Sequence, residues 1–344
     1  MKVAKIYSLE DIRIEDMPTP EVGPGEALIR MKVCGLCTSD MIPWYVARKV
    51  PAVLGHEPVG VVVKVGRDAV GFQKGDPVFV HHHAPCFTCR LCRRGFFSLC
   101  KVWKASHLVP GGLAEFVKIP AHNLKYDTLK LPEGMSFEDG SLIEPLACSV
   151  KALKRARVRS GDIVLVIGLG IMGQLNALLA RHYGARMVFG ADLVPYRLEK
   201  VLSLGADAAV DVSKEDLAER VRGLTDGLMA DVVIVGPGSL EAMRSGLSCA
   251  GRGGTVMFFT PSGPEERLEI NPHDLYFNEV TLMTSYSCGP YDTREAMELI
   301  GQGIVSAERL VTHRFPLEET AEGFKKAKEA GASLKTLIVM DGEG

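Results

Sequence analysis

Four cysteines lie close together in the pattern Cys-x2-Cys-x2-Cys-x7-Cys, at Cys86, Cys89, Cys92 and Cys100. Four thiolates complete the tetrahedral shell of a zinc ion and leave no open position, so such a site stabilises a loop and does not activate a substrate. An iron–sulfur cluster also takes four thiolates, and the spacing does not exclude it. Because no signal peptide is visible at the start of the chain, we expect metal binding and not a disulfide framework.

A second set of possible metal ligands is dispersed along the chain: Cys37, the pair His56-Glu57, and Glu144. Each residue by itself is weak evidence for a metal site, since a lone cysteine, for example, is usually a small core residue. Together they offer a thiolate, an imidazole and carboxylates. This mixed set is typical of a catalytic zinc ion with an open or exchangeable position.

The third motif is the glycine-rich segment Gly168-Leu169-Gly170-Ile171-Met172-Gly173, which follows an apolar run and opens a helical pattern. Asp192 comes nineteen residues after the last glycine, at the end of the next predicted strand. This context is the dinucleotide fingerprint, in which backbone N–H groups approach a pyrophosphate and the acidic residue binds the adenosine ribose. A plain strand–helix turn with a surface aspartate is the alternative.

The glycine-rich segment lies within a series of alternating predicted strands and helices in the middle of the chain, and these elements must position it. The predicted strands are 162–167, 186–191, 208–212, 230–235 and 254–259. A helix is predicted at 171–183, directly after the first strand. This alternation predicts an α/β fold, a doubly wound parallel sheet with right-handed crossovers.

The two ends of the chain look different from the middle. In the first 150 residues, short β-branched runs such as 59–65 and 77–80 are broken by glycine and proline, which predicts a β-rich, loop-rich domain. After about Ser287, two helical patterns precede a final strand predicted at 336–340.

Composition excludes several classes of function. The 344 residues are 47% hydrophobic and 24% charged, which is average for a globular protein and excludes a disordered chain. A formal charge of −2 makes a nucleic-acid or anionic-membrane binder unexpected. The apolar stretch 163–180 contains three glycines, so a strand turning into a helix explains it better than a membrane span. We expect a soluble, cytoplasmic protein.

Three consecutive histidines, His81-His82-His83, allow two interpretations. They could form an extra metal site beside the cysteine motif. We expect instead the end of a strand with alternating, exposed imidazoles.

Taken together, these motifs resemble the zinc-containing alcohol and polyol dehydrogenases of the medium-chain dehydrogenase/reductase superfamily, over essentially the full length. The resemblance extends to Gly35-Leu-Cys-Thr-Ser-Asp40, Gly55-His-Glu57 and Ala114-Glu-Phe116. Within the superfamily, Ile143-Glu-Pro-Leu146 is similar to the sorbitol dehydrogenase branch, which has a glutamate where alcohol dehydrogenases place a zinc-binding cysteine.

This resemblance implies a GroES-like catalytic domain at 1–149 and 287–344, and a Rossmann domain at 150–286. It implies two zinc ions per chain, one catalytic and one structural, and NAD as cofactor, with NADP less expected because Asp192 would face its 2′-phosphate and Arg197 comes too late to bind that phosphate. It also implies a homotetramer or homodimer.

The roles of individual residues follow from the same resemblance. Cys37 and His56 become direct ligands of the catalytic zinc, while Glu57 and Glu144 bind it directly or through water. Asp40 orients His56, and Ser39 relays the substrate proton. Many relatives have a histidine five residues after the zinc-binding cysteine, but this chain has Ile42, so the path of the proton to solvent stays open. Arg197 matches a family position near the adenosine.

The implied activity is the reversible NAD-linked oxidation of a secondary alcohol or polyol to a ketone. Alternatives are a threonine-type or simple alcohol dehydrogenase and, outside enzymology, a zinc-stapled nucleotide-binding sensor. The presence of Cys37, His56 and Ser39 favours the enzyme.

Overall fold

The computed structural model describes residues 1–340, and residues 341–344, the end of the predicted segment 287–344, lie outside the described residues. The chain divides into two compact units. One consists of Met1–Ala147, Cys288–Glu329 and the residues from Ser333 on; the other consists of Cys148–Ser287 and Ala330–Ala332.

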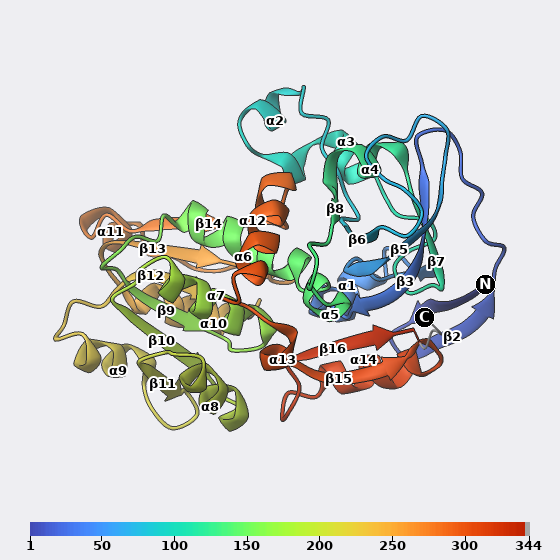
Figure 1. The fold of residues 1–344 in the computed structure, drawn as a ribbon. Helices are drawn as coiled ribbons and strands as arrows, with labels where there is room; N and C mark the ends of the chain where they lie inside the picture. The colour runs from blue at the N-terminus through green and yellow to red at the C-terminus, as the bar shows by residue number, and fades with distance from the viewer. Residues whose placement is uncertain (341–344) are drawn as a thin grey trace. The chain divides into compact units, whose positions relative to one another are not determined.

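The second unit is built on a six-stranded parallel sheet (Figure 1). Its strand order is β11 (Ala208–Asp211), β10 (Met187–Asp192), β9 (Ile163–Ile167), β12 (Ala230–Val235), β13 (Ala250–Phe258) and β14 (Thr281–Thr284). Every residue of β9 is buried, as expected for a central parallel strand covered on both faces. This order is that of a doubly wound Rossmann sheet, which confirms the predicted fold class.

Helices cover this sheet and complete its crossovers. α7 (Ile171–His182) packs on β9 and β10, α8 (Pro195–Ser203) packs on β10 and β11, and α10 (Leu240–Ser248) packs on β12 and β13. The remaining helices of the unit are α9 (Leu217–Leu224) and α11 (Pro272–Phe277). The apolar stretch 163–180 is thus β9 followed by α7, as predicted.

The first unit contains two mixed or antiparallel sheets. The larger has the order β15 (Val311–Pro316), β16 (Lys335–Val339), β3 (Ala27–Gly35), β5 (Pro58–Val65), β6 (Pro77–Val80) and β8 (Thr128–Lys130), with β7 (Phe116–Ile119) also paired to β3. The smaller has the order β2 (Asp11–Asp16), β1 (Lys2–Ser8) and β4 (Ala52–Val53). Strands β15 and β16, from the end of the chain, therefore share a sheet with β3 from its beginning.

Short helices and turns join these strands. They are the 3-10 turns η1 (Thr38–Met41), η2 (Phe97–Leu99) and η3 (Leu317–Glu319) and the helices α1 (Pro43–Val46), α2 (Arg90–Arg93), α3 (Lys101–Ala105), α4 (Ala121–Asp127), α5 (Phe137–Gly140), α12 (Pro290–Gly301), α13 (Ala307–Leu310) and α14 (Thr320–Lys328). α6 (Ile143–Ala156) runs from the first unit into the second. Among residues 1–340, no helix combines the length and apolar character needed to cross a bilayer.

Candidate catalytic and metal sites

Three of the dispersed ligand candidates come together in the first unit. Cys37 follows β3 and precedes η1, while His56 and Glu57 form the turn between β4 and β5. One donor atom from each of the three residues lies within 4.8 Å of the other two. A thiolate, an imidazole and a carboxylate at this separation suit a zinc ion.

Asp40 holds the ring of His56 in place. Its carboxylate, only 4% exposed, lies 3.0 Å from His56 Nδ1, and Lys49 Nζ lies 3.5 Å from the other oxygen. Burial acts to lower the pKa of His56, but Asp40 and Cys37 outweigh it and hold that pKa well above its usual value. The surroundings of this imidazole therefore favour positive charge, which a metal cation can supply in place of the proton.

Glu57 is buried against a lysine of the last strand. Its carboxylate pairs with Lys335 Nζ, and neither side chain is more than 1% exposed. Gly35 makes room for this pair, because a Cβ at that position would lie 1.8 Å from Glu57 Oε2. Burial raises the pKa of Glu57, although Lys335 opposes this. Among the described residues, Glu57 Oε1 has no hydrogen-bond donor, which fits an oxygen that awaits a metal ion.

Glu144 does not belong to this group. It lies in the first turn of α6, is 4% exposed, and has a donor atom within 4.8 Å of ring nitrogens of both His81 and His82. Its negative charge is still felt by Glu57, whose pKa it raises. The structure thus brings Cys37, His56 and Glu57 together, and Glu144 lies outside this group.

Ser39 lies beside the same cluster. Its hydroxyl donates a hydrogen bond to Cys37 Sγ at 3.3 Å, from η1. Ile42, which ends this turn, has no titratable group.

The four cysteines of the spaced motif also come together. The Sγ–Sγ distances are 3.5 Å for Cys89–Cys92, 3.6 Å for Cys86–Cys100 and 3.9 Å for Cys86–Cys92. A tetrahedral zinc ion with Zn–S bonds of about 2.3 Å places its sulfurs about 3.8 Å apart. No disulfide joins any of the nine cysteines, all of which lie within residues 1–340, so this cluster fits a cation.

Backbone and hydroxyl groups point at these sulfurs. The amides of Cys89 and Cys92 donate to sulfurs at 3.4 and 3.5 Å, and Thr88 Oγ1 donates to Cys86 Sγ at 3.5 Å. The Thr88 hydrogen bond contributes most to lowering the pKa of Cys86 to about 6, whereas burial raises the pKa of Cys92 to about 12. Such donors stabilise thiolates that bind a metal.

The glycine-rich segment forms the turn from β9 into α7, as predicted. Gly173 lies so close to this turn that a Cβ there would be 2.0 Å from the carbonyl oxygen of Gly168. At Gly170, the N-cap of α7, the nearest atoms to an added Cβ belong to Arg197 at 3.9 Å, so the backbone is open to a ligand. These are the close packing and the open approach that a pyrophosphate site requires.

The Asp192 carboxylate accepts hydrogen bonds from three backbone amides. Oδ2 accepts from the amide of Leu169 at 2.6 Å, and Oδ1 accepts from those of Leu193 and Val194 at 2.7 and 2.9 Å. The N-cap of α8 is Val194, so Asp192 is not the capping residue of that helix. A carboxylate has about four acceptor positions, and three are used, so one on Oδ2 is left for a ribose hydroxyl.

Arg197 lies closer to Asp192 than the sequence suggested. Its Nη1 is 3.7 Å from Asp192 Oδ2. Arg197 thus lies beside the carboxylate that we expect to face the ribose, while its distance from a 2′-phosphate stays a prediction. One turn of α8 brings it back because Pro195 begins the helix directly after the Asp192 loop.

The histidine run differs from expectation. His81 is fully buried and His83 is 9% exposed, so the predicted exposed imidazoles are wrong. The run follows β6, and its side chains pack among one another and against Trp103, with ring centroids of His83 and Trp103 4.0 Å apart. The reason is that polar partners far away in the sequence satisfy these rings in the interior, as described below.

Two charged residues of the site were not predicted. Lys335 stands in the apolar strand β16, and Lys49 follows α1. A lysine inside a short apolar strand is itself a signal, because a buried lysine needs an anionic partner.

Two family models match the chain. The alcohol dehydrogenase GroES-like domain matches residues 23–133, and the zinc-binding dehydrogenase model matches residues 172–302. The first range contains Cys37, His56, Glu57 and the four-cysteine cluster.

Individual proteins match over nearly the full length. Sorbitol dehydrogenase from sheep (Ovis aries) is 35% identical, with 98% of this chain and 95% of that protein covered. A putative zinc-binding dehydrogenase from Sinorhizobium meliloti, solved bound to NADP, has a TM-score of 0.89 at 27% identity, covering 98% of each chain. The 2R,3R-butanediol dehydrogenase from Bacillus subtilis has a TM-score of 0.86 at 27% identity, covering 99% of each chain.

Proposed function

Because this chain belongs to the zinc-dependent alcohol and polyol dehydrogenases, we propose that it catalyses the reversible oxidation of a secondary alcohol or polyol to a ketone. The observation that carries this proposal is the group of Cys37, His56 and Glu57 beside the Ser39 hydroxyl. A metal ligand set next to a group that can move a proton is what alcohol oxidation needs.

Cys37 and His56 hold the catalytic zinc in this proposal, with Glu57 as the third group and Glu144 reaching the ion through water. When bound, zinc supplies positive charge that favours loss of the alcohol proton, and the nicotinamide accepts the hydride. Lys335 offsets part of the negative charge that Glu57 would offer to the zinc ion, because the two side chains form a buried ion pair. Asp40 keeps the His56 ring oriented through Nδ1.

Ser39 takes the substrate proton and passes it on. Its hydroxyl lies 3.3 Å from Cys37 Sγ, so it is next to the metal cluster. Because Ile42 cannot carry a proton, Ser39 would have to hand the proton on to water or to a group other than the side chain at position 42.

The substrate class rests on the polyol branch of the family. Ile143-Glu-Pro-Leu146 supports it, as does the similarity to sheep sorbitol dehydrogenase. A threonine-type or simple alcohol dehydrogenase is the alternative enzyme. A panel of sorbitol, xylitol, ribitol, butanediol and threonine, followed by absorbance of the reduced nicotinamide, tests these possibilities. No turnover of any alcohol would favour the nucleotide-binding sensor.

We expect a preference for NAD over NADP. The Asp192 carboxylate can accept a hydrogen bond from the ribose, whereas it repels a 2′-phosphate. Arg197 partly offsets this repulsion. Asp192→Ser should therefore shift the ratio of kcat/KM for NAD against NADP toward NADP by roughly 10- to 100-fold, since a hydrogen bond to a charged group is worth about 1.5–3 kcal/mol.

The same variant should also lower thermal stability. Asp192 is more than a ribose ligand, because its carboxylate accepts three backbone hydrogen bonds in the protein itself. Asp211→Ser is the matched control: Asp211 is the register partner of Asp192 on β11 and accepts from the amide of Ser213. An unchanged cofactor ratio in Asp192→Ser would remove the basis for the preference.

A homodimer or homotetramer is also part of the proposal. β14 is an edge strand of the parallel sheet, and Tyr276 and Phe277 of the preceding helix α11 are 77% and 67% exposed. An open sheet edge near exposed aromatic rings favours association of two copies. Light scattering at working concentration should give at least twice the chain mass, and a single monomeric species would refute this prediction.

A cytoplasmic location completes the proposal. None of the nine cysteines, all within residues 1–340, forms a disulfide, which is typical of a protein of a reducing compartment. Recovery of the native protein in the cytosolic fraction of its cells would test it.

A further inference from the structure

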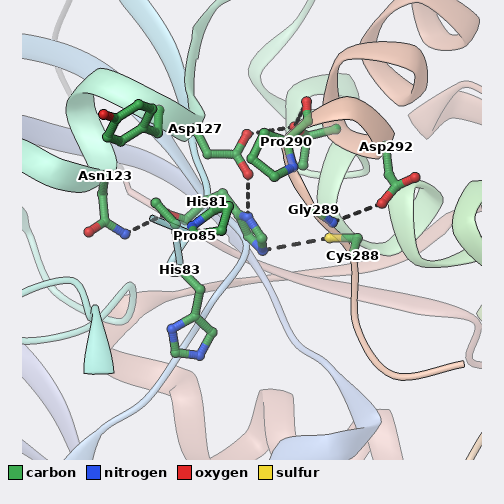
Figure 2. A network of polar contacts seen from close by, with 12 residues as sticks. His81, His83, Pro85, Asn123, Asp127, Cys288, Gly289, Pro290 and Asp292 are labelled. Carbon is green, nitrogen blue, oxygen red and sulfur yellow. Dashed lines mark hydrogen bonds and ion pairs between the residues drawn. The ribbon is translucent and has the colours of Figure 1, made fainter. Parts of the chain in front are cut away.

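A buried polar network holds His81, the first residue of the histidine run (Figure 2). His81 Nδ1 lies 2.6 Å from Asp127 Oδ2, and Thr293 Oγ1 donates to Asp127 Oδ1 at 2.6 Å. Asn123 Nδ2 donates to the carbonyl oxygen of His81 at 3.2 Å. Both the ring of His81 and the peptide group that joins it to His82 are therefore fixed.

The last residue of the run, His83, is held as well. Its Nδ1 lies 2.5 Å from the carbonyl oxygen of Ser106, and its ring packs against Trp103. The chain on both sides of His82 is thus anchored by side chains that have their own partners in the interior. A residue supported in this way keeps one position, which is what a contact with a ligand requires.

His82, between these two anchors, has no such partner. Within residues 1–340, its Nδ1 is enclosed by protein and has no hydrogen-bond partner. The residue as a whole is only half-buried, so its accessible part lies at atoms other than Nδ1. A buried N–H without an acceptor is costly, and the neutral ring carries its proton on one nitrogen only, so that proton belongs on Nε2. His82 therefore offers an N–H donor at Nε2.

The ring of His82 lies beside the catalytic group. Its centroid is 5.0 Å from that of His56, and one of its nitrogens lies within 4.8 Å of a carboxylate oxygen of Glu144. Both neighbours are assigned to the catalytic zinc in the proposed function. A substrate bound at that metal therefore has His82 as a neighbour, and an N–H donor suits a second oxygen of such a substrate.

We propose that His82 is a specificity-determining residue, which binds a second hydroxyl group of the substrate next to the hydroxyl that is oxidised. This inference rests on the proposed function and narrows the substrate class to vicinal diols and polyols. A monohydric alcohol has no oxygen for this donor and leaves it unpaired when water is displaced. A site that is built to hydrogen-bond a hydroxyl discriminates against the analogue that lacks it.

Two alcohols with the same carbon skeleton test the inference, because 2,3-butanediol differs from 2-butanol only in the second hydroxyl. His82→Phe keeps a planar ring and removes its nitrogens. In this variant, the ratio of kcat/KM for butanediol to that for 2-butanol should fall by about 10- to 100-fold. His82→Gln, whose amide replaces Nε2, should retain more of the ratio. His122→Phe, the same change at a half-buried histidine of α4 outside every ligand group of residues 1–340, should leave the ratio unchanged.

Binding gives a second measurement that does not depend on turnover. Each alcohol should raise the Tm of the zinc-loaded protein in the absence of NAD, and the dependence on concentration gives its dissociation constant. The unaltered protein should bind butanediol more tightly than 2-butanol, and His82→Phe should lose this preference. His82→Leu replaces His82→Phe in both measurements if the latter does not fold.

A ratio that is the same in His82→Phe and in the unaltered protein would overturn the inference and mean that water satisfies the ring. Equal losses for both alcohols would overturn it as well, because a merely structural role affects both alike. If neither alcohol is oxidised but the preference in binding depends on His82, the proposed oxidation is wrong and the contact with the second hydroxyl stands.

Discussion

A Cys37→Ser variant should keep its fold, lose one zinc ion per chain and lose most of its dehydrogenase activity. Cys37 supplies the thiolate of the group formed with His56 and Glu57, and the serine hydroxyl is a far weaker ligand at neutral pH. A catalytic metal contributes several kcal/mol of charge stabilisation in the transition state. Since about 1.4 kcal/mol is tenfold in rate, kcat/KM should fall by about 10³-fold. Zinc analysis and initial rates measure the two effects.

Cys34→Ala is the matched control for this prediction. Cys34 is fully buried on β3, and burial raises the pKa of its thiol to about 12, so it stays protonated and is not a ligand candidate. This variant should retain the zinc content of the unaltered protein. If Cys37→Ser kept its zinc and its activity, the catalytic assignment of the whole cluster would be wrong.

The Rossmann unit could be predicted well from the sequence because its signals are local. The run 163–167 is apolar throughout, and Gly168 to Gly173 marks the turn into the following helix. Strand β14 was not predicted. Its four residues, Thr281–Thr284, lie at the sheet edge and are exposed or half-buried, so they lack the apolar run that identifies a central strand.

The sheet of the first unit was predicted only in outline. Its central strand β3 carries Arg30 and Lys32 within an otherwise apolar segment, which weakens the pattern. Its neighbours are β5, β7 and β16, the last of which lies at the other end of the chain. Local patterns contain no information on pairing over such distances, so the place of the C-terminal strands came from the resemblance alone.

The ligand residues could be predicted from their types, but their partners could not. Cys37, His56 and the four spaced cysteines are chemically distinctive wherever they stand. Lys335 and Asp127 act only because the fold brings them to Glu57 and His81, far away in the sequence. The same long-range contacts explain why His81 is buried, since its polar ring is satisfied by Asp127 in the interior.

Cys92→Ser should lower the stability of the protein and leave the chemistry of the catalytic group unchanged. Cys92 is 5% exposed, and its sulfur lies 3.5 Å from Cys89 Sγ in the four-cysteine cluster. The buried core of this lobe is small: besides Cys92 and Cys100, it contains Phe97 and Trp103. A lobe with so small a core depends on its metal for folding free energy.

The expected size of this effect follows from that dependence. Loss of a structural metal belongs to the changes that cost more than about 4 kcal/mol. At roughly 2 °C per kcal/mol for a unit of this size, the Tm should fall by about 10 °C. The zinc content should fall by one ion, and limited proteolysis should cut first between Cys86 and Cys100. Calorimetry and zinc analysis measure these changes.

Cys249→Ser shows what the same substitution does at a buried cysteine without a metal. Cys249 is fully buried in the second unit and belongs to no ligand group among the described residues. Burying a hydroxyl there should cost about 1–3 kcal/mol, which is less than the loss at Cys92, and should leave the zinc content unchanged. Equal losses of Tm in the two variants with zinc retained in both would mean that the cysteine lobe is held by packing. Absorbance of thiolate-bound iron in the purified protein would instead mean that the four thiolates hold an iron ion in place of zinc, because a single iron ion accepts the same tetrahedral sulfur geometry.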